Sequence, residues 1–261
     1  MIYIDIHGHV NFPDFDADRE DAIKRAKDAG VAMITVGTDM KSSVSAVELA
    51  SIHENMWATV GVHPTDSKEA VDWDQLERLA GHPKVVAIGE CGLDYFHSKE
   101  EDIPRQKDIF EKHIALANKL NKPLMLHVRN GKIGGKGITG NAYQDALAMI
   151  QKSAKVRSNF HFFAGTMQDM KDIIANNGTV SFTGVLTFTS DYDELVKSVP
   201  PTHIMSETDC PFVPPVPYRG KRNEPVYVIE TVKAIARIRG ESETAVAGQL
   251  MENARNFFGL K

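Results

Sequence analysis

The sequence predicts an α/β fold, and within that class a (β/α)8 TIM barrel. Eight short apolar runs alternate along the chain with amphipathic segments of helical period. Strands that alternate with helices pair in parallel, and eight such units in 261 residues match the size of one barrel. A doubly wound open sheet is the structural alternative. It more often carries a glycine fingerprint after its first strand, and none stands there.

The apolar runs give the predicted strands. These lie at residues 2–6, 31–36, 56–60, 85–88, 124–126, 160–163, 179–182 and 204–205. Each is followed by a predicted helix or a long loop. The predicted helices lie at residues 18–29, 43–53, 73–80, 104–120, 142–153, 167–175, 192–199, 226–238 and 243–257.

The first predicted helix shows how these elements are recognised. Ala22, Ile23 and Ala26 recur at helical spacing, and Gly30 stands where a helix ends. Pro123 marks the end of the fourth helix in the same way. No linker, low-complexity run or block of charge divides the chain, so we expect one domain over residues 1–261.

Composition and charge argue against several classes of protein. No apolar run approaches the ~20 residues that span a bilayer, so we expect no membrane association. Polar residues interrupt the apolar N-terminus, which argues against a signal peptide and for a cytoplasmic location. The 2 cysteines argue against a disulfide framework. The net charge of −5 argues against nucleic-acid binding through bulk charge, so a polyanion would need a local basic patch or bound metal.

Histidines and carboxylates stand at the ends of six predicted strands, where a barrel places its active site. His7 and His9 are two residues apart on an extended backbone, so both imidazoles point to the same side. Unpaired polar groups at so many strand ends would each cost several kcal/mol, and a metal centre gives each of them a partner. The residues are His7, His9, His63, Glu90, His127, His161 and Asp209.

This nitrogen and carboxylate set suits Mg²⁺, Mn²⁺, Co²⁺ or Zn²⁺. Six of these residues, all except His63, are the candidate ligands, and six exceed what one catalytic ion takes while it keeps an open position, so we expect two divalent ions. Glu90, on a central strand, is the expected bridge. Cys91 should point away from the metal, because neighbours on a strand face opposite sides. We expect Asp5 to orient His7 and His9, and Gly8 to leave room between their rings.

Seven segments of the chain carry a family resemblance. They are His-x-His at 7–9, Gly-Val-His-Pro at 61–64, Gly-Glu-Cys-Gly-Leu-Asp at 89–94, His-Val-Arg at 127–129, His-Phe-Phe-Ala-Gly at 161–165, Glu-Thr-Asp-Cys-Pro at 207–211 and Arg-Gly-Lys-Arg-Asn-Glu-Pro at 219–225. Together they resemble the TatD deoxyribonuclease family of the metal-dependent amidohydrolase superfamily. The resemblance runs in order along essentially the whole chain.

The resemblance implies a TIM-barrel metal-dependent hydrolase that acts on DNA as an exonuclease with divalent metal. The chain departs from the family's usual pattern at Cys91 and Cys210, at Phe162, Ala164 and Tyr218, and again in residues 131–140. These departures fall on none of the implied ligands and bear on the substrate instead. The resemblance implies one ion held by His7, His9, Glu90 and Asp209, and a second ion held by Glu90, His127 and His161.

The leading hypothesis is hydrolysis of phosphodiester bonds in DNA by a water molecule that divalent metal activates. Glu90 and Asp209 are the expected catalytic residues: Glu90 joins the two ions, and Asp209 accepts the proton of the water. The alternative is a metal-dependent hydrolase of an ester, amide or aminoacyl bond, because the same metal set supports both. A catalytically silent nucleic-acid-binding module is a third hypothesis, and the intact ligand set argues against it.

Expected substrate contacts lie around this set. His63, Arg129 and Arg219, with the segment up to Arg222, are expected to contact phosphate, since guanidinium groups match phosphate oxygens. Tyr95 and Phe96 could stack on a base, and Glu207 could orient a ligand. Residues 131–140 are rich in glycine and predict a flexible loop over the site. DNA is the expected partner, as substrate, and no obligate protein partner is evident.

Overall fold

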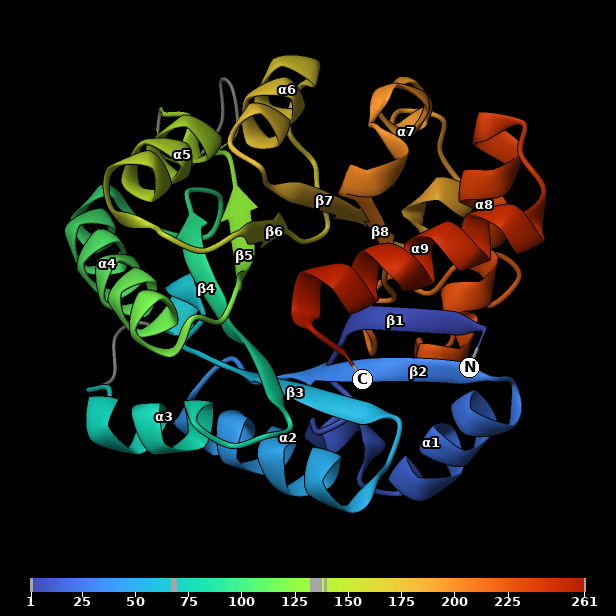
Figure 1. The fold of residues 1–261 in the computed structure, drawn as a ribbon, viewed down its shortest axis with the longest axis horizontal. Helices are drawn as coiled ribbons and strands as arrows, with labels where there is room; N and C mark the ends of the chain where they lie inside the picture. Colours follow the sequence, from blue (N-terminus) through green and yellow to red (C-terminus); the bar gives the residue numbers. More distant parts are fainter. Residues whose placement is uncertain (1, 67–69, 132–137, 139, 261) are drawn as a thin grey trace.

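The computed structural model describes residues 2–66, 70–131, 138 and 140–260. Eight parallel strands lie in the order β1 to β8 and curl into a nearly closed barrel, with helices around it (Figure 1). The predicted TIM barrel is confirmed. The strands are β1 (Tyr3–Gly8), β2 (Val31–Val36), β3 (Met56–Val60), β4 (Val85–Asp94), β5 (Leu124–Arg129), β6 (Ser158–Phe160), β7 (Thr179–Phe182) and β8 (Ile204–Ser206).

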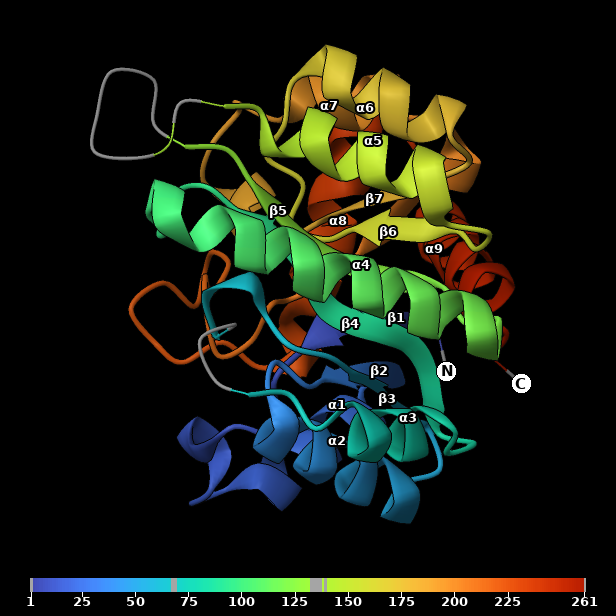
Figure 2. The ribbon, with the colours of Figure 1, turned by 90° about the vertical axis from the view of Figure 1, so that its left-hand side faces the viewer.

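The helices of the described residues pack along the outside of the barrel (Figure 2). Side-chain caps start several of them: Asp39 accepts from the Ser42 amide before α2, and Asn141 accepts from two amides of α5. The helices are α1 (Arg19–Asp28), α2 (Met40–Ile52), α3 (Trp73–Ala80), α4 (Ile103–Leu120), α5 (Ala142–Ser153), α6 (Met167–Ala175), α7 (Asp193–Ser198), α8 (Val228–Arg239) and α9 (Glu243–Phe258). None of these helices is both long and apolar enough to cross a membrane.

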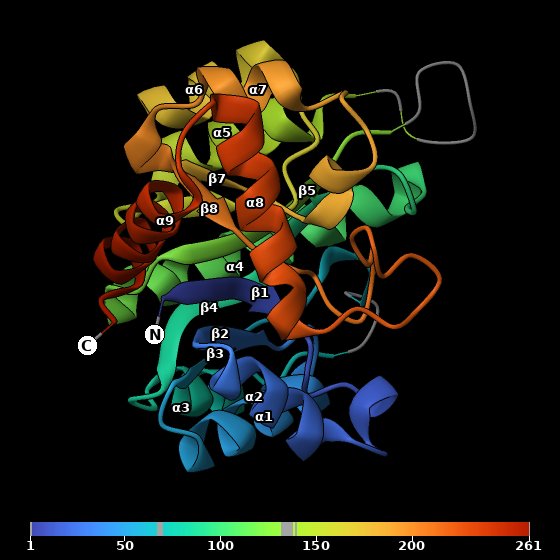
Figure 3. The ribbon, with the colours of Figure 1, turned by 90° about the vertical axis from the view of Figure 1, so that its right-hand side faces the viewer.

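Two hydrophobic clusters hold the fold together. The larger one lies between the strands and the surrounding helices. The smaller one fills the barrel with side chains such as Ile4, Ile34 and Met125, and it includes Met251 and Phe257 of α9. Helix α9 therefore covers the end of the barrel at which the strands begin (Figure 3). The opposite end, at the carboxyl ends of the strands, is free to carry a site.

The barrel closes where the segment after β8 returns to β1. The Ser206 hydroxyl donates to the Ile4 carbonyl at 3.3 Å, and the Asp209 amide donates to the His7 carbonyl at 2.8 Å. The His9 amide in turn donates to the Cys210 carbonyl at 2.7 Å. These bonds place the first and last polar segments of the sequence side by side. All strands share this one sheet, so we propose that residues 1–261 form one domain.

Five predicted strands, the first, fourth, fifth, sixth and eighth, have bounds that differ from the structure, and two of these differences bear on the site. The sixth was predicted at 160–163, but β6 is Ser158–Phe160. Phe162 adopts a φ of 42°, which breaks the extended backbone, so His161 follows the strand. The fourth was predicted at 85–88, but β4 continues through Asp94 because its second half pairs with β5, with Gly92 opposite His127. A Cβ on Gly92 would lie 2.2 Å from the His127 carbonyl oxygen, so glycine is needed there.

Candidate metal centre

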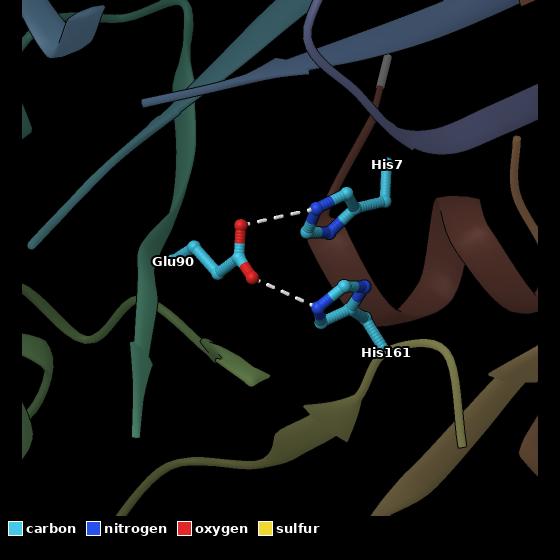
Figure 4. Close-up of side chains that lie close together, drawn as sticks. All are labelled: His7, Glu90 and His161. Atoms are coloured by element: carbon cyan, nitrogen blue, oxygen red, sulfur yellow. Dashed lines mark ion pairs between the residues drawn. The ribbon is translucent and has the colours of Figure 1, made fainter. Parts of the chain in front are cut away.

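Glu90 lies at the centre of the polar cluster inside the mouth of the barrel. Its side chain comes from β4 and is only 3% exposed. One carboxylate oxygen, Oε2, lies 3.3 Å from Nε2 of His7, and the other, Oε1, lies 2.9 Å from Nε2 of His161. Figure 4 shows the two oxygens pointing at different imidazoles. One carboxylate therefore faces two separate groups of nitrogen atoms.

The first group gathers around Oε2 of Glu90. Nε2 of His9 lies 3.7 Å from that oxygen and 3.4 Å from Oδ1 of Asp209. Nε2 of His7 lies 3.8 Å from the same Asp209 oxygen and 3.2 Å from Nε2 of His9. Four side chains from β1, β4 and the segment after β8 thus point their donor atoms into one small volume, as a metal ion requires.

The second group gathers around Oε1 of Glu90. Nδ1 of His127 lies 3.2 Å from this oxygen, beside the His161 contact. Nε2 of His63 lies 3.5 Å away on the same side. The structure therefore brings together side chains that the sequence singled out, from β4, β5 and the segments after β3 and β6.

Hydrogen bonds on the far side of three rings fix their tautomers. Nδ1 of His9 donates to the Val36 carbonyl at 3.1 Å, Nε2 of His127 donates to Asp94 at 2.9 Å, and Nδ1 of His161 contacts Glu207 at 3.3 Å. In each neutral ring the other nitrogen then carries a lone pair. These lone pairs face the Glu90 and Asp209 carboxylates, so the cluster is rich in electron pairs and fits a bound cation.

His63 differs from the other rings. Its Nδ1 accepts the Thr65 amide at 3.2 Å and lies 2.7 Å from the Thr65 hydroxyl. The neutral ring therefore carries its proton on Nε2, the atom that faces Glu90. A nitrogen that holds a proton does not bind metal, so His63 is better suited to donate a hydrogen bond than to act as a ligand.

His7 is packed tightly inside the same cluster, with Nε2 as the atom that faces the carboxylates. Its ring stacks on His161 with centroids 3.8 Å apart, and it is fully buried. Among the described residues its Nδ1 has no hydrogen-bond partner. In the same part of the chain, Glu90 and Asp209 form ion pairs only with imidazoles. No lysine or arginine neutralises these two carboxylates there, which leaves that task to a bound cation.

The charges of the cluster depend on each other. Burial alone would raise the pKa of Glu90, but the imidazoles of His161, His7 and His63 hold it well below its usual value. Burial is likewise outweighed at Asp209, whose pKa is lowered by the His9, His161 and His7 rings in the protonated form that they can take when no metal is bound. Both carboxylates are therefore ionised at neutral pH, the state in which they bind metal.

A cavity of about 760 Å³ opens over this cluster at the carboxyl ends of the strands. Arg129 lies in its wall, with its guanidinium carbon 4.1 Å from the centre of the Phe96 ring. The cavity is lined by His9, Phe12, Thr38, His63, Thr65, Asp66, Glu90, Asp94, His97, His127, Val128, Arg129, His161, Phe162, Ala164, Tyr192, Asp209, Phe212 and Val213. Most of the residues expected to act in catalysis or binding thus lie in one pocket.

Three expected substrate contacts lie elsewhere. Arg219 is exposed outside the cavity lining and donates to the Pro214 carbonyl at 2.7 Å. Arg222 does not grip phosphate, because its guanidinium pairs with Asp18 at 2.6 and 2.8 Å and with Glu224 at 3.1 Å. Tyr95 cannot stack on a base, because it is only 2% exposed and its hydroxyl donates to Asp145. Residues 132–137 and 139 of the expected loop lie outside the described residues.

Asp94 is a residue of the site that the sequence reasoning missed. It is fully buried and accepts from His127, from Nδ1 of His97 at 3.0 Å, and from the amides of Phe96 and His97. The signal was present: Asp94 lies four residues after Glu90, on the same face of an extended strand.

The structure also answers three smaller expectations. Glu207 contacts His161 as expected. Asp5 bonds to the amides of His7 and Thr208 and not to a ring. Gly8 does not leave room between the imidazoles, because a Cβ there would lie 2.8 Å from the Cys210 sulfur instead.

Comparison with known proteins gives the family. A family model described as TatD related DNase matches residues 4–259. A relative from Bacillus subtilis (strain 168), named uncharacterized metal-dependent hydrolase YabD, is 34% identical over 264 residues, which cover 98% of each chain. This chain belongs to the TatD related DNase family.

Two further comparisons agree with the membership in the TatD related DNase family. A relative from Erwinia amylovora, named 3'-5' ssDNA/RNA exonuclease TatD, is 33% identical over 270 residues, which cover 98% of this chain and 99% of the relative. The crystal structure of YjjV, a TatD homolog from Escherichia coli K12, has a TM-score of 0.88 to this chain at 24% identity and covers 100% of both chains. That structure supports the same fold.

Two of the departures from the usual TatD pattern lie in the cavity wall, and none of those in the described residues is a candidate ligand. Phe162 and Ala164 line the cavity. Tyr218 stacks on Tyr227 with centroids 3.7 Å apart. Cys91 is buried and points its sulfur toward the Met125 carbonyl, away from the cavity, as the alternation of the strand predicts.

Proposed function

We propose that this protein is a metal-dependent hydrolase that cleaves phosphodiester bonds of DNA from a strand end, with two divalent ions. The observation that carries the proposal is the position of Glu90, whose two oxygens face separate groups of imidazole lone pairs. A carboxylate in that position suits a bridge between two cations. The alternative, a single ion, would leave one group of buried nitrogens without a partner.

The ligand assignment follows from the two groups. His7, His9 and Asp209 would hold one ion with Oε2 of Glu90. His127 and His161 would hold the other with Oε1. Imidazole and carboxylate donors suit Zn²⁺ and Mn²⁺, and sites with open positions for water also accept Mg²⁺. Asp94 and Glu207 would keep His127 and His161 in the tautomers that these bonds require.

The bound ions would supply a water of lowered pKa and offset the negative charge on the phosphate. Asp209 is ionised because the neighbouring imidazoles lower its pKa, and it borders the cavity, so it is placed to accept a proton from the attacking water. His63 presents its protonated Nε2 from the cavity wall and would donate to a phosphate oxygen. Arg129 adds a permanent positive charge in the same wall.

The names of relatives and an arginine in the cavity wall support DNA as the substrate. Relatives at about one third identity carry the names metal-dependent hydrolase and 3'-5' ssDNA/RNA exonuclease. Arginine in the cavity wall matches a phosphodiester better than a neutral ester, because the guanidinium pairs with anionic oxygens. An ester, amide or aminoacyl bond is the alternative substrate, and the same metal ligands would serve it.

The experiment is a substrate panel with the purified protein. End-labelled single-stranded DNA and RNA are incubated with Mg²⁺, Mn²⁺ or Zn²⁺, beside aryl esters and lactones. We expect progressive shortening of DNA from one end, and loss of that activity in Asp209→Asn. Turnover of esters or lactones without cleavage of nucleic acid under any metal would refute the proposal.

A further inference from the structure

Exposed apolar side chains gather beside the cavity. Five large apolar side chains are exposed among the described residues, and three of them, Phe188, Phe212 and Val216, lie on the segments that follow β7 and β8. The other two, Ile2 and Ile52, lie near the starts of β1 and β3, at the opposite end of the strands. The segment after β8 projects beyond the carboxyl ends of the strands (Figure 3). Exposed apolar side chains that gather at one end of a barrel indicate a binding surface for a ligand with apolar groups.

Phe212 connects this surface to the site. Its ring is 50% exposed, lines the cavity, and lies with its centroid 6.2 Å from that of His9. Its backbone is held firmly: the Phe212 amide donates to the Asp209 carbonyl at 2.9 Å, and the buried Asn223 side chain donates to the Phe212 carbonyl at 2.6 Å. A fixed backbone that presents a bare aromatic face is suited to contact a flat partner.

Phe188 and Arg219 form a second contact point further out. The Arg219 guanidinium carbon lies 4.1 Å from the centre of the Phe188 ring, and both side chains are exposed. The Val216 amide donates to the Thr187 hydroxyl at 2.8 Å, which ties the segments after β7 and β8 together. The pair offers a planar stacking surface with a positive charge, the combination that serves single-stranded nucleic acid.

We propose that Phe212 and the Phe188–Arg219 pair form a stacking path for the bases of a single nucleic-acid strand. Phe212 stacks on the base of the nucleotide whose phosphate lies at the candidate metal centre of Glu90 and Asp209. Phe188 stacks on a further base, and Arg219 pairs with the phosphate of that nucleotide. The inference rests on the proposed function. It names single strands as the substrate form, because a paired base has no free face for an aromatic ring. The acidic chain, of net charge −5, holds the strand through these local contacts and not through bulk charge.

The test compares Phe212→Ala with Phe212→Trp, which keeps an aromatic face, and with Ile52→Ala, which removes a still more exposed apolar side chain at the other end of the barrel. Each is assayed with Mg²⁺ on a single strand and on the same strand with an abasic terminal nucleotide. We expect Phe212→Ala to lower kcat/KM on the normal strand about tenfold and to change little on the abasic strand. Phe212→Trp and Ile52→Ala should keep the wild-type ratio. Equal values for wild type and Phe212→Ala, or an equal loss on both strands, would overturn the inference.

The outer pair has its own test. A Phe188→Ala, Arg219→Ala double variant should weaken cleavage of long single strands and leave that of a dinucleotide unchanged. An equal loss on both lengths would overturn this part of the path.

A binding measurement separates the inference from the proposed function. A strand with 2-aminopurine at its end is titrated with the Asp209→Asn protein in the presence of Mg²⁺, because hydrolysis in this variant is slowed. Stacking quenches the fluorescence of the base, and Phe212→Ala in the same background should abolish the quenching. This result would support the path even if the wild type cleaved no strand, in which case only the proposed function fails. Absence of quenching with Phe212 intact would overturn the path even if the wild type cleaved DNA.

Discussion

Replacing Asp94 with asparagine tests how the second group of ligands is held. Asp94 is fully buried, and its Oδ2 lies 2.9 Å from Nε2 of His127. Asparagine keeps one oxygen for the backbone amides of Phe96 and His97 but turns an NH2 group toward His127. The imidazole must then place its proton on Nδ1, the atom that faces Glu90 at 3.2 Å. Asp94→Asn therefore removes a lone pair from the metal site without touching a ligand.

The expected decrease in metal affinity follows because His127 loses the carboxylate that orients its ring. Such changes lower metal affinity or activity by roughly 10–100-fold, which corresponds to about 1.4–2.7 kcal/mol. Calorimetric titration with Zn²⁺ should show one of two sites weakened by that factor and the other unchanged. Activity should fall at limiting metal and recover in large part at excess metal, because Asp94 acts through His127 and not on the substrate.

Asp145→Asn is the matched control. This aspartate also accepts from two side chains, Lys107 and Tyr95, but it lies outside the cavity. Its replacement should leave both metal affinities intact. If Asp94→Asn binds two ions with wild-type affinity, or loses both sites equally, the assignment of His127 to a separate ion is wrong.

Three further outcomes are expected. Asp209→Asn should lower kcat by roughly 10²–10⁴-fold through loss of the proton acceptor, and a rate within a few-fold of wild type in a quench assay would exclude that role. Arg129→Ala should raise KM for DNA and leave turnover of a neutral aryl ester unchanged, whereas equal effects on both would deny a contact with phosphate. The pKa of His113 is lowered from 6.5 to about 4 by burial, so the unfolded chain binds the proton more readily and stability falls as pH drops from 6.5 to 4. Over this range His113 should contribute about 3 kcal/mol to the loss of stability. In urea unfolding, His113→Gln, which keeps an acceptor for the Val62 amide, should therefore lose that much less stability than the wild type.

The cluster of imidazoles and carboxylates was predictable because it depends on local pattern and barrel symmetry. Strand ends are visible as the places where apolar runs stop, and a parallel barrel brings all eight carboxyl ends together. Alternation along the strand then separates inward from outward side chains, which is why Glu90 and Cys91 were assigned to opposite faces. The imidazoles and carboxylates at these strand ends could therefore be recognised without knowing how the loops fold.

The substrate contacts were less predictable, because each depends on a partner far away in the sequence. Arg222 is engaged by Asp18, which is 204 residues away, and Tyr95 by Asp145, which is 50 residues away. Neither pairing leaves a periodic signal. Phe212 stands in a proline-rich segment with no regular structure, so its exposure beside the cavity became visible only once the segment was placed.

Strained backbone conformations are found around the cavity. Among the described residues five non-glycine residues have a positive φ, and two of these are asparagines that follow helices. The other three, Phe162, Asp209 and Val213, all line the cavity. Such conformations cost on the order of 1–3 kcal/mol each, and they persist where surrounding bonds impose them. The Phe162 amide, for example, donates to the buried Glu207 carboxylate at 2.7 Å.

The number of divalent ions held by each chain tests the bridging role of Glu90 most directly. Elemental analysis of the purified protein, combined with calorimetric titration of the metal-free form, gives this number for the wild type and for Glu90→Ala. We predict two ions per chain in the wild type and a marked loss of both in Glu90→Ala, with loss of hydrolysis. Full occupancy in Glu90→Ala, or a single ion in the wild type under saturating metal, would contradict a carboxylate that joins two ions.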